Sequence, residues 1–346
     1  MPAASQEQPT VLAQYLVMCM HTMLRLKSSL EHQGWIGKNA TMHGSPDCVL
    51  LHSGGPPSHL ATFSLLVGPP RLRATIRQPH WPSDKDVVDD VHEIPLHQRP
   101  QQFDVIVEEW KHGAWYHKAR IQASSLAHTM NELQRYSPKT SFEGEGHQKI
   151  PQHPFWVGSL SYDLVQWTQP LEFAFRPKKN SLLACFYLIE HGVVFDCLLD
   201  TLHSFKVPDS NWSPQLSNWS EQKFDKEPIH NPHLSLNKQL TDDEYIDRIR
   251  SVQDRIIEGD VYQVNIGQLW QGTLNFDPWT SFCLLDQVNP APYSAFFEID
   301  DEGLTLISSS PECLMESIDG IVHSAPIKGT AHTGVSEDET LSLIHI

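Results

Sequence analysis

The clearest periodic pattern of hydrophobic residues in this 346-residue chain lies in residues 241–259 and has the spacing of an α-helix. Thr241, followed three residues later by Glu244, forms a capping-box pattern at the start of this stretch. Gly259 stands where a left-handed residue ends a helix. One apolar stripe with helical spacing runs between them: Tyr245, Ile249, Val252 and Ile256. The pattern predicts an amphipathic helix from 242 to 258.

Elsewhere short apolar runs and period-two alternation predict strands, with turn residues between them. The predicted strands are 48–54, 61–67, 103–108, 115–121, two within 182–199, 261–269, 295–299, 304–308 and 321–323. His112-Gly113, His191-Gly192 and the 300–303 segment are the expected turns. Residues 124–134 have helical character. The short turns favour antiparallel pairing, so we expect an α+β fold with layered antiparallel sheets and flanking helices.

Composition narrows the possible functions. The chain carries 42 acidic and 25 basic residues, a net charge of -17. This charge disfavours nucleic acid and anionic membranes as main partners, and an anionic substrate would need locally placed cations. There is no G-x-G-x-x-G segment and no P-loop, so a nucleotide has no recognisable site.

Histidine and cysteine are spaced without any metal-binding pattern. The 20 histidines are scattered, and the six cysteines form no C-x-x-C pair. Buried, reduced cysteines are typical of a reducing compartment. The apolar stretch 11–24 is too short to cross a bilayer and lacks a basic front, so a cytoplasmic location is expected.

One lysine stands in a distinctive setting near the end of the chain. Lys328 follows Pro326-Ile327, and Gly329 after it lets a ligand approach the backbone closely. Apolar surroundings favour the neutral amine, which is a nucleophile. On the residues alone, a strand-end lysine facing water remains the alternative.

Four motifs in order carry a family resemblance. They are 258–265 (EGDVYQVN), 289–296 (NPAPYSAF), 310–312 (SPE) and 326–330 (PIKGT). Together they resemble the chorismate-utilising enzymes. Within that family, a lysine between Pro-Ile and Gly-Thr is similar to the aminodeoxychorismate synthase component I branch, whereas anthranilate synthases carry alanine at this position. The likeness is tight over 241–330 and looser from residue 45.

The resemblance implies roles for several residues. Lys328 would attack chorismate and Glu312 would move a proton or hold the lysine. Substrate contacts would come from Gly329, Thr330, Gln263 and Asn265. Without the resemblance, a turn residue is the favoured interpretation of Glu312. The face that carries Gln263 and Asn265 could then equally be a solvent-exposed sheet face.

A tryptophan pocket is the second implied site, with tryptophan as a candidate ligand. Ser53 in the Leu-Leu-His-Ser-Gly segment would supply a hydroxyl. The remaining pocket residues would be Leu60, Ala61, Thr62, Phe63, Pro292, Tyr293 and Ser294.

The family also implies a domain plan and partners. We expect an N-terminal region over 1–205, a linker over 206–236, and the first part of a chorismate-binding domain over 237–346. Chorismate would be the substrate, a glutamine amidotransferase subunit would supply ammonia, and Mg²⁺ would be required.

The family's Mg²⁺ ligands follow the Pro-Ile-Lys-Gly-Thr segment, and residues 331–346 do not resemble that part, so truncation and an incomplete sheet are expected. Anthranilate synthase, or a non-catalytic fragment that binds tryptophan or the amidotransferase, is the alternative.

Overall fold

The computed structural model describes residues 23, 25–38, 44–55, 61–79, 101–143, 151–169, 178–216, 235–318 and 320–327. The chain divides into two compact units. The first contains residues 1–224 and 282–346, and the second contains residues 225–281. All strand pairs are antiparallel and helices are few, so the expected α+β class with antiparallel sheets is confirmed.

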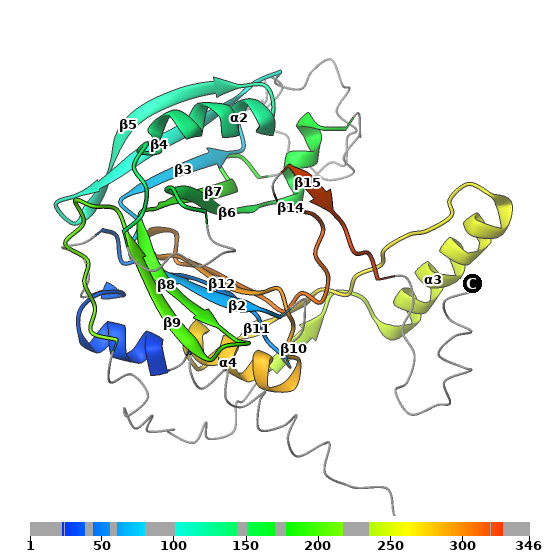
Figure 1. Ribbon diagram of the computed structural model, residues 1–346. Helices are drawn as coiled ribbons and strands as arrows, with labels where there is room; N and C mark the ends of the chain where they lie inside the picture. The colour runs from blue at the N-terminus through cyan, green and yellow to red at the C-terminus, as the bar shows by residue number, and fades with distance from the viewer. Residues whose placement is uncertain are drawn as a thin grey trace, which may run out of the picture. The chain divides into compact units, whose positions relative to one another are not determined.

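A six-stranded sheet organises the first unit, with β1 near its centre (Figure 1). In spatial order its strands are β13 (Leu304–Ser308), β12 (Ser294–Ile299), β1 (Val49–His52), β2 (Phe63–Val67), β8 (His191–Asp196) and β9 (Thr201–Lys206). The two neighbours of β1 come from parts of the chain that are distant from each other. Val49 pairs with Val67 of β2 on one side and with Phe297 of β12 on the other.

A five-stranded sheet forms the second layer. In spatial order its strands are β5 (Ala114–Ala123), β4 (Phe103–Lys111), β3 (Leu72–Arg77), β7 (Leu182–Ile189) and β6 (Phe155–Leu160). The β4–β5 hairpin turns at His112 and Gly113, which have φ of 51° and 79°. Two successive positive φ angles match the twist of a two-residue hairpin, so this predicted turn is confirmed.

The core lies between the two sheets. Val49, Val67 and Phe297 from the first sheet pack with Tyr187 and Ile189 from the second, all less than 5% exposed. The rings of Tyr187 and Phe297 stack with centroids 5.1 Å apart and planes inclined by 16°. The side chains buried between the two sheets are removed from water, and this burial stabilises the packing of one sheet on the other.

Helices cover the outer faces of the sheets. Leu133 of α2 (Leu126–Leu133) packs on the far side of the five-stranded sheet beside Val105. Leu164 of the 3₁₀ segment η4 (Tyr162–Trp167) joins the same cluster. Phe282 of α4 (Pro278–Val288) meets Phe296 on the far side of the six-stranded sheet, with centroids 6.0 Å apart. Two further 3₁₀ segments are η3 (Gln134–Tyr136) and η6 (Asp300–Glu302).

The chain crosses from one sheet to the other at Glu190. The two strands predicted within 182–199 exist as β7 and β8, but they lie in different sheets. His191 is the first residue of β8 and is buried, so the turn predicted at His191-Gly192 is wrong. Glu190 is held by Arg71, whose Nε and Nη2 donate to it at 3.0 and 2.8 Å.

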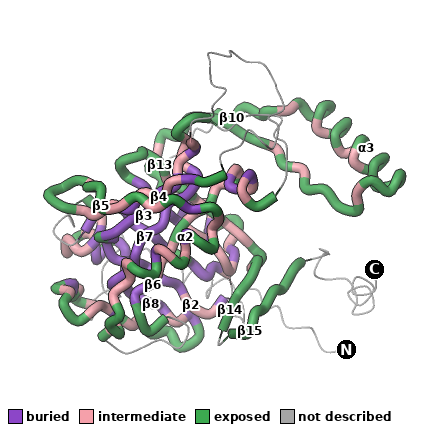
Figure 2. Tube along the Cα trace, turned by 90° about the horizontal axis from the view of Figure 1, so that it is seen from above, coloured by how far each residue is buried: buried purple, intermediate pink, exposed green. Residues whose placement is uncertain are grey.

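The second unit contains β10 (Ser235–Lys238), α3 (Asp242–Glu258) and β11 (Trp270–Thr273). Thr241 and Glu244 make both capping-box contacts, and Gly259 has φ of 81°. The helix is therefore the one predicted, including both ends. None of its residues is buried, and Figure 2 shows α3 in the exposed and intermediate colours.

The strand predicted at 261–269 is absent, whereas the strand predicted at 321–323 exists. Residues 261–269 form no strand, because the β10–β11 ladder begins only at Trp270. A single backbone bond, from Gln239 N to the Leu269 carbonyl at 2.8 Å, extends that pairing. β15 (Ile321–His323) is the strand predicted at 321–323. It pairs with β14 (Glu316–Ile318) in a separate two-stranded sheet whose residues are all exposed. The predicted domain boundaries stay a prediction.

Candidate functional site

Two of the four sequence motifs lie side by side in the first unit. The backbone N–H of Tyr293 donates to the carbonyl of Ser310 at 3.1 Å. Asn289 Nδ2 donates to Ser309 Oγ at 3.0 Å, and that hydroxyl donates to the Asn289 carbonyl at 2.7 Å. These three bonds join the end of α4 to the segment after β13. The Asn289–Phe296 motif thereby fixes the start of the Ser-Pro-Glu motif.

Glu312 is exposed in the loop between β13 and β14. Its backbone carbonyl accepts a bond from Ser310 Oγ at 3.2 Å, so the loop is ordered locally. Cys313, the next residue, lies beside Tyr293; burial raises the pKa of the Tyr293 phenol, and Cys313 adds to the rise. The carboxylate of Glu312 is thus presented to solvent from a loop whose base is anchored to the other motif.

The remaining predicted chorismate residues fall in other places. Lys328, Gly329, Thr330 and Leu60 lie outside the described residues. Gln263 and Asn265 belong to the second unit and are both exposed. Since residues 261–269 form no strand, these two amides do not make the strand face that alternation predicted. Their assignment as substrate contacts stays a prediction.

The predicted tryptophan-pocket residues gather at the end of β1. His52 pairs with Ser294, and Gly54 N donates to the Ala291 carbonyl at 2.9 Å. Ser53 is 8% exposed, and its Oγ donates to the Phe63 carbonyl at 2.7 Å. Ser53 therefore still has lone pairs free to accept a hydrogen bond.

Around this point the structure brings together seven of the eight predicted pocket positions. Those positions are Ser53, Ala61, Thr62, Phe63, Pro292, Tyr293 and Ser294. They come from three neighbouring segments: the end of β1, the start of β2 and the start of β12. Proximity alone assigns no ligand to them, so the pocket stays a prediction.

A buried polar chain beside this region was not predicted. His52 Nδ1 lies 3.0 Å from Ser64 Oγ, which also accepts the Ser53 N–H at 3.1 Å. His52 Nε2 lies 3.5 Å from Asp286 Oδ1, and both side chains are about 5% exposed or less. The Ser64 hydroxyl can donate to Nδ1. His52 Nε2 and Asp286 Oδ1 face each other, but neither atom has a hydrogen-bond partner within normal distance among the described residues. The signal in the sequence was a histidine and an aspartate at positions whose neighbours are apolar.

Gly54 is required by the same arrangement. A Cβ added at Gly54 would lie 2.6 Å from Asp286 Oδ1 and 2.9 Å from the Ala291 nitrogen. Both distances are shorter than van der Waals contact. The Ser-Gly sequence therefore lets the backbone at the end of β1 approach α4.

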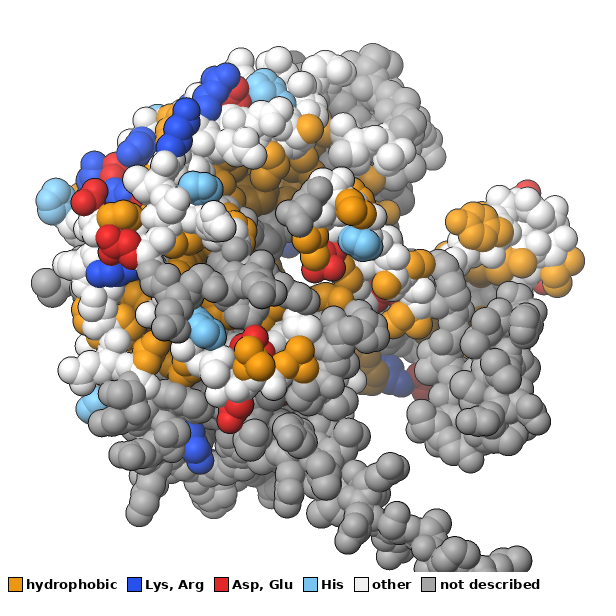
Figure 3. All heavy atoms as spheres, in the orientation of Figure 1, with side chains coloured by type: hydrophobic (Ala, Val, Ile, Leu, Met, Phe, Trp, Pro, Cys, Tyr) orange, Lys and Arg blue, Asp and Glu red, His pale blue; other side chains and the backbone are white. Residues whose placement is uncertain are grey.

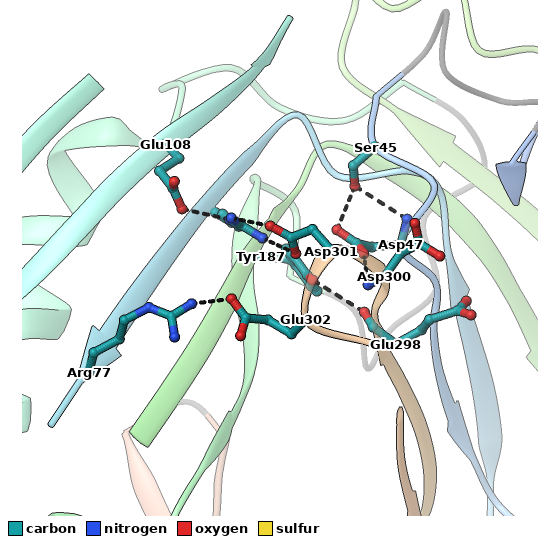
Figure 4. Close-up of polar contacts among 10 residues, drawn as sticks. Ser45, Asp47, Arg77, Glu108, Tyr187, Glu298, Asp300, Asp301 and Glu302 are labelled. Atoms are coloured by element: carbon teal, nitrogen blue, oxygen red, sulfur yellow. Dashed lines mark hydrogen bonds and ion pairs between the residues drawn. The ribbon is translucent and has the colours of Figure 1, made fainter. Parts of the chain in front are cut away.

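A second polar cluster ties the two sheets together at the turn between β12 and β13 (Figure 4). Arg73 of β3 donates to both oxygens of Asp301, at 2.6 and 2.7 Å, and to Glu108 at 2.7 Å. Arg77 pairs with Glu302 in the same turn. Asp47 Oδ1 accepts the Asp300 N–H at 2.7 Å. We call this group, formed by Arg73, Arg77, Glu108, Asp301 and Glu302, the turn clamp.

Burial and neighbouring charges shift the pKa values of ionisable groups in and beside the turn clamp. Burial raises the pKa of Asp47, although its bonds from Asp300 and Ser45 oppose the rise. Burial also raises the pKa of Glu298; Lys27 opposes this, and nearby Asp300 and Asp47 add to it. The pKa of Arg73 is raised because Asp301 and Glu108 outweigh the effect of its burial. Burial therefore disfavours the ionised form of the two carboxyl groups beside the turn clamp.

Mg²⁺ has no site among the described residues. No group of three or more His, Cys, Asp or Glu side chains in that part of the chain could hold a metal ion. The carboxylates of the turn clamp are already paired with arginines, so they do not fit the ion. No helix of the described segments is long and apolar enough to cross a membrane.

The curated relatives that match this chain are named for two different activities. The alpha subunit 2 of anthranilate synthase, chloroplastic, from Oryza sativa subsp. japonica is 27% identical over 58% of this chain and 38% of that protein. Aminodeoxychorismate synthase component 1 of Escherichia coli (strain K12) is 33% identical over 32% of this chain and 24% of that protein. The Klebsiella aerogenes protein of the same name is 40% identical over 26% and 20%. The chain thus spans less than half the length of these relatives.

A solved structure and a family model also match. Anthranilate synthase component I from Streptococcus pneumoniae TIGR4 aligns over 78% of this chain and 55% of that chain, with a TM-score of 0.48 and 17% identity. The family described as chorismate binding enzyme matches residues 94–345, past residue 330 where the recognisable motifs end. That match covers well over half of the chain. The chain therefore belongs to the chorismate binding enzyme family.

Proposed function

We propose that this chain is an aminodeoxychorismate synthase component I, which converts chorismate and ammonia to 4-amino-4-deoxychorismate for 4-aminobenzoate and folate synthesis. The observation that carries the proposal is Lys328 between Pro326-Ile327 and Gly329-Thr330. Relatives named for this activity are among those that match. A separate glutamine amidotransferase subunit would supply the ammonia.

The chemistry requires a nucleophile that later leaves. The neutral Lys328 amine attacks ring position 2, the two ring double bonds shift, and the 4-hydroxyl departs as water after taking a proton. Ammonia then attacks position 4, the double bonds shift back, and the lysine amine is expelled. Chorismate and ammonia thus become 4-amino-4-deoxychorismate and water, with the enzyme unchanged.

The proposed roles of the other residues follow from what each can donate or accept. Glu312 exchanges the proton between the amine and the departing hydroxyl, since a carboxylate suits general acid–base work. The Gly329 N–H and the Thr330 hydroxyl donate to a substrate carboxylate. Gln263 and Asn265 add amide donors, although they are exposed in the described structure.

Product analysis tests the proposal. The chain is incubated with chorismate, ammonium and Mg²⁺, and the products are separated by chromatography. We expect 4-amino-4-deoxychorismate, and an adduct on Lys328 in quenched samples by mass spectrometry. Lys328→Ala and Lys328→Arg should lose the adduct, because arginine keeps its charge. Lys178→Ala, at an exposed lysine outside the motifs, is the matched control.

Two results would reject this assignment. Anthranilate as the product would place the chain in the other branch of the family. An unchanged rate and product in Lys328→Ala would remove the nucleophile.

A non-catalytic tryptophan binder is the second candidate. The gathering of Ser53, Thr62 and Ser294 at the end of β1 favours it. Calorimetry with tryptophan, and separately with chorismate plus Mg²⁺, distinguishes the two functions. Binding of tryptophan alone that is weakened in Ser53→Ala would support the second candidate, whereas Mg²⁺-dependent binding of chorismate would support the first.

A further inference from the structure

The loop between β13 and β14, residues 309–315, is not held in place by a core; we call it the Glu312 loop. None of its residues is buried, and Glu312 itself is exposed. The β14–β15 hairpin that follows is exposed throughout its two strands. Ordering a loop costs conformational entropy, which buried apolar side chains would normally offset. The position of Glu312 therefore depends on the hydrogen bonds at the two ends of the loop.

Three successive residues attach the base of the Glu312 loop to the segment around the end of α4. Ser308 ends the regular ladder with β12. Ser309 and Asn289 then exchange two bonds: Asn289 Nδ2 donates to Ser309 Oγ at 3.0 Å, and this hydroxyl donates to the Asn289 carbonyl at 2.7 Å. The Ser310 carbonyl accepts the Tyr293 N–H at 3.1 Å. Asn289 is thus the side chain that extends the attachment beyond the ladder.

Few rotatable bonds separate this anchored base from Glu312. Pro311 fixes its own φ and restricts the residue before it to extended conformations. Ser310 Oγ also donates to the Glu312 carbonyl at 3.2 Å, which closes a short turn around the proline. A displacement of Ser309 or Ser310 would therefore be passed on to the Glu312 carboxylate.

The far end of the Glu312 loop is attached to the segment that leads to Lys328. Ser324 Oγ donates to the Leu314 carbonyl at 3.0 Å. Ser324 follows β15 directly and precedes Lys328 by four residues, while Leu314 follows Glu312 by two. Antiparallel pairing of β14 with β15 brings the two segments together (Figure 1). The Ser324 bond continues their contact past the end of that ladder, in the direction of both motifs.

We propose that Asn289, Ser309 and Ser324 are positioning residues that hold Glu312 at a fixed place beside the segment that carries Lys328. Each acts through the backbone of the Glu312 loop and not on the substrate. A general acid–base group works within hydrogen-bond distance of its proton, and a misplacement of about 1 Å can slow a reaction by about 100-fold. Their effect on the reaction rests on the proposed function, whereas their effect on the order of the loop can be measured without turnover.

Alkylation of Cys313 by iodoacetamide measures the order of the Glu312 loop directly. Cys313 is half-buried and adjacent to Glu312, so a looser attachment of the loop exposes its thiol. Peptide mass spectrometry resolves each cysteine separately. The buried Cys283 of α4 reports any general unfolding in the same sample.

Substitutions at the two ends of the loop should change this rate. Asn289→Ala and Ser309→Ala should each raise the alkylation rate of Cys313 about three- to tenfold, the range expected for loss of a hydrogen bond, with Cys283 unchanged. Ser324→Ala should act in the same direction. The double variant at positions 289 and 309 should be no faster than either single one, because both changes remove the same pair of bonds.

Two control variants separate the bond from the substitution. Ser309→Thr keeps the hydroxyl and should retain the parent's alkylation rate. Ser317→Ala removes an exposed hydroxyl from β14 and should change nothing.

Steady-state kinetics with chorismate, ammonium and Mg²⁺ tests the catalytic consequence. Asn289→Ala should lower kcat about 10- to 100-fold and change KM by less than about twofold, because the loop places Glu312 and does not bind chorismate. Equal alkylation of Cys313 in the parent, Asn289→Ala and Ser309→Ala would overturn the proposal, whatever the parent produces. Faster alkylation with an unchanged kcat would overturn the positioning role. If the parent makes no 4-amino product but the alkylation rates change as expected, the proposed function fails and the attachment of the Glu312 loop by these residues stands.

Discussion

α3 and β7 represent opposite ways in which this sequence specifies structure. α3 has a capping box at its start and a left-handed glycine at its end, yet it buries none of its residues. β7 has no local start or stop signal, and seven of its eight residues are buried. The ends of an element can therefore be set by neighbouring residues, whereas its burial depends on strands that are distant in the sequence.

The difference predicts where stability resides. The apolar stripe of α3 remains accessible, and Figure 3 shows hydrophobic side chains on the surface of this helix. Tyr187 of β7 is stacked on Phe297 and is excluded from water. Loss of an apolar side chain should thus cost far more free energy of unfolding in the sheets than in α3.

The largest expected effect comes from truncating the core. Phe297→Ala should lower the free energy of unfolding by about 3–5 kcal/mol, because it leaves a cavity between the sheets. Val252→Ala, on the stripe of α3, should change it by about 0.5 kcal/mol or less. Urea denaturation of the two variants measures the difference. Similar losses would show that the stripe of α3 is buried after all.

The turn clamp should give an intermediate effect. Arg73→Ala should destabilise the chain by about 2–3 kcal/mol, because it leaves Glu108 and Asp301 without their guanidinium partner. In a double-mutant cycle with Asp301→Asn, we expect a coupling of about 1–3 kcal/mol. Thermal denaturation of the four proteins provides the values. Additive effects would mean that the Arg73–Asp301 pair does not stabilise the turn.

The smallest effect should be local to α3. Thr241→Ala should cost about 1 kcal/mol, measured by hydrogen exchange in the first turn of the helix. The Thr241 backbone N–H holds the pKa of Glu244 below its ordinary value. A lowered folded pKa means that this contact stabilises the helix above pH 4.5 and is lost as pH falls through the folded pKa. Protection against exchange in the first turn should therefore fall at acidic pH in the parent more than in Glu244→Gln, because the glutamine side chain does not titrate.

The control for this prediction is the other capped helix. Ser125 caps α2, and α2 buries Leu133 in the core. Ser125→Ala should lower the global unfolding free energy, whereas Thr241→Ala should affect only α3. Equal global losses would contradict the contrast between the two units.

Local signals explain which parts of the fold could be predicted. The ends of α3, the His112-Gly113 hairpin and the turn between β12 and β13 each depend on residues that are close in sequence. β3 was missed, since Arg73 and Arg77 interrupt its apolar pattern and find their carboxylate partners only in the folded chain.

Long-range pairing explains what could not be predicted. Alternation at 261–269 resembled a strand, but a strand needs a neighbour, and β10 pairs only with residues 270–273. For the site, the motifs located the Asn289 and Ser310 segments, which the structure joins by hydrogen bonds. The chain from Ser64 through His52 to Asp286 had no motif, because Asp286 is more than 200 residues from the other two residues in the sequence.

The pairing of β1 has a consequence for how the protein is made. β1 meets β2 soon after synthesis, but its other neighbour, β12, is encoded roughly 250 residues later. At about 5–20 residues per second, a ribosome delivers β12 roughly 10–50 s after β1. Throughout that interval Val49 and Leu50 lie in a strand with one open side. The nascent chain therefore has to be kept from aggregating until β12 emerges, because the central strand of the sheet gains its second neighbour only then.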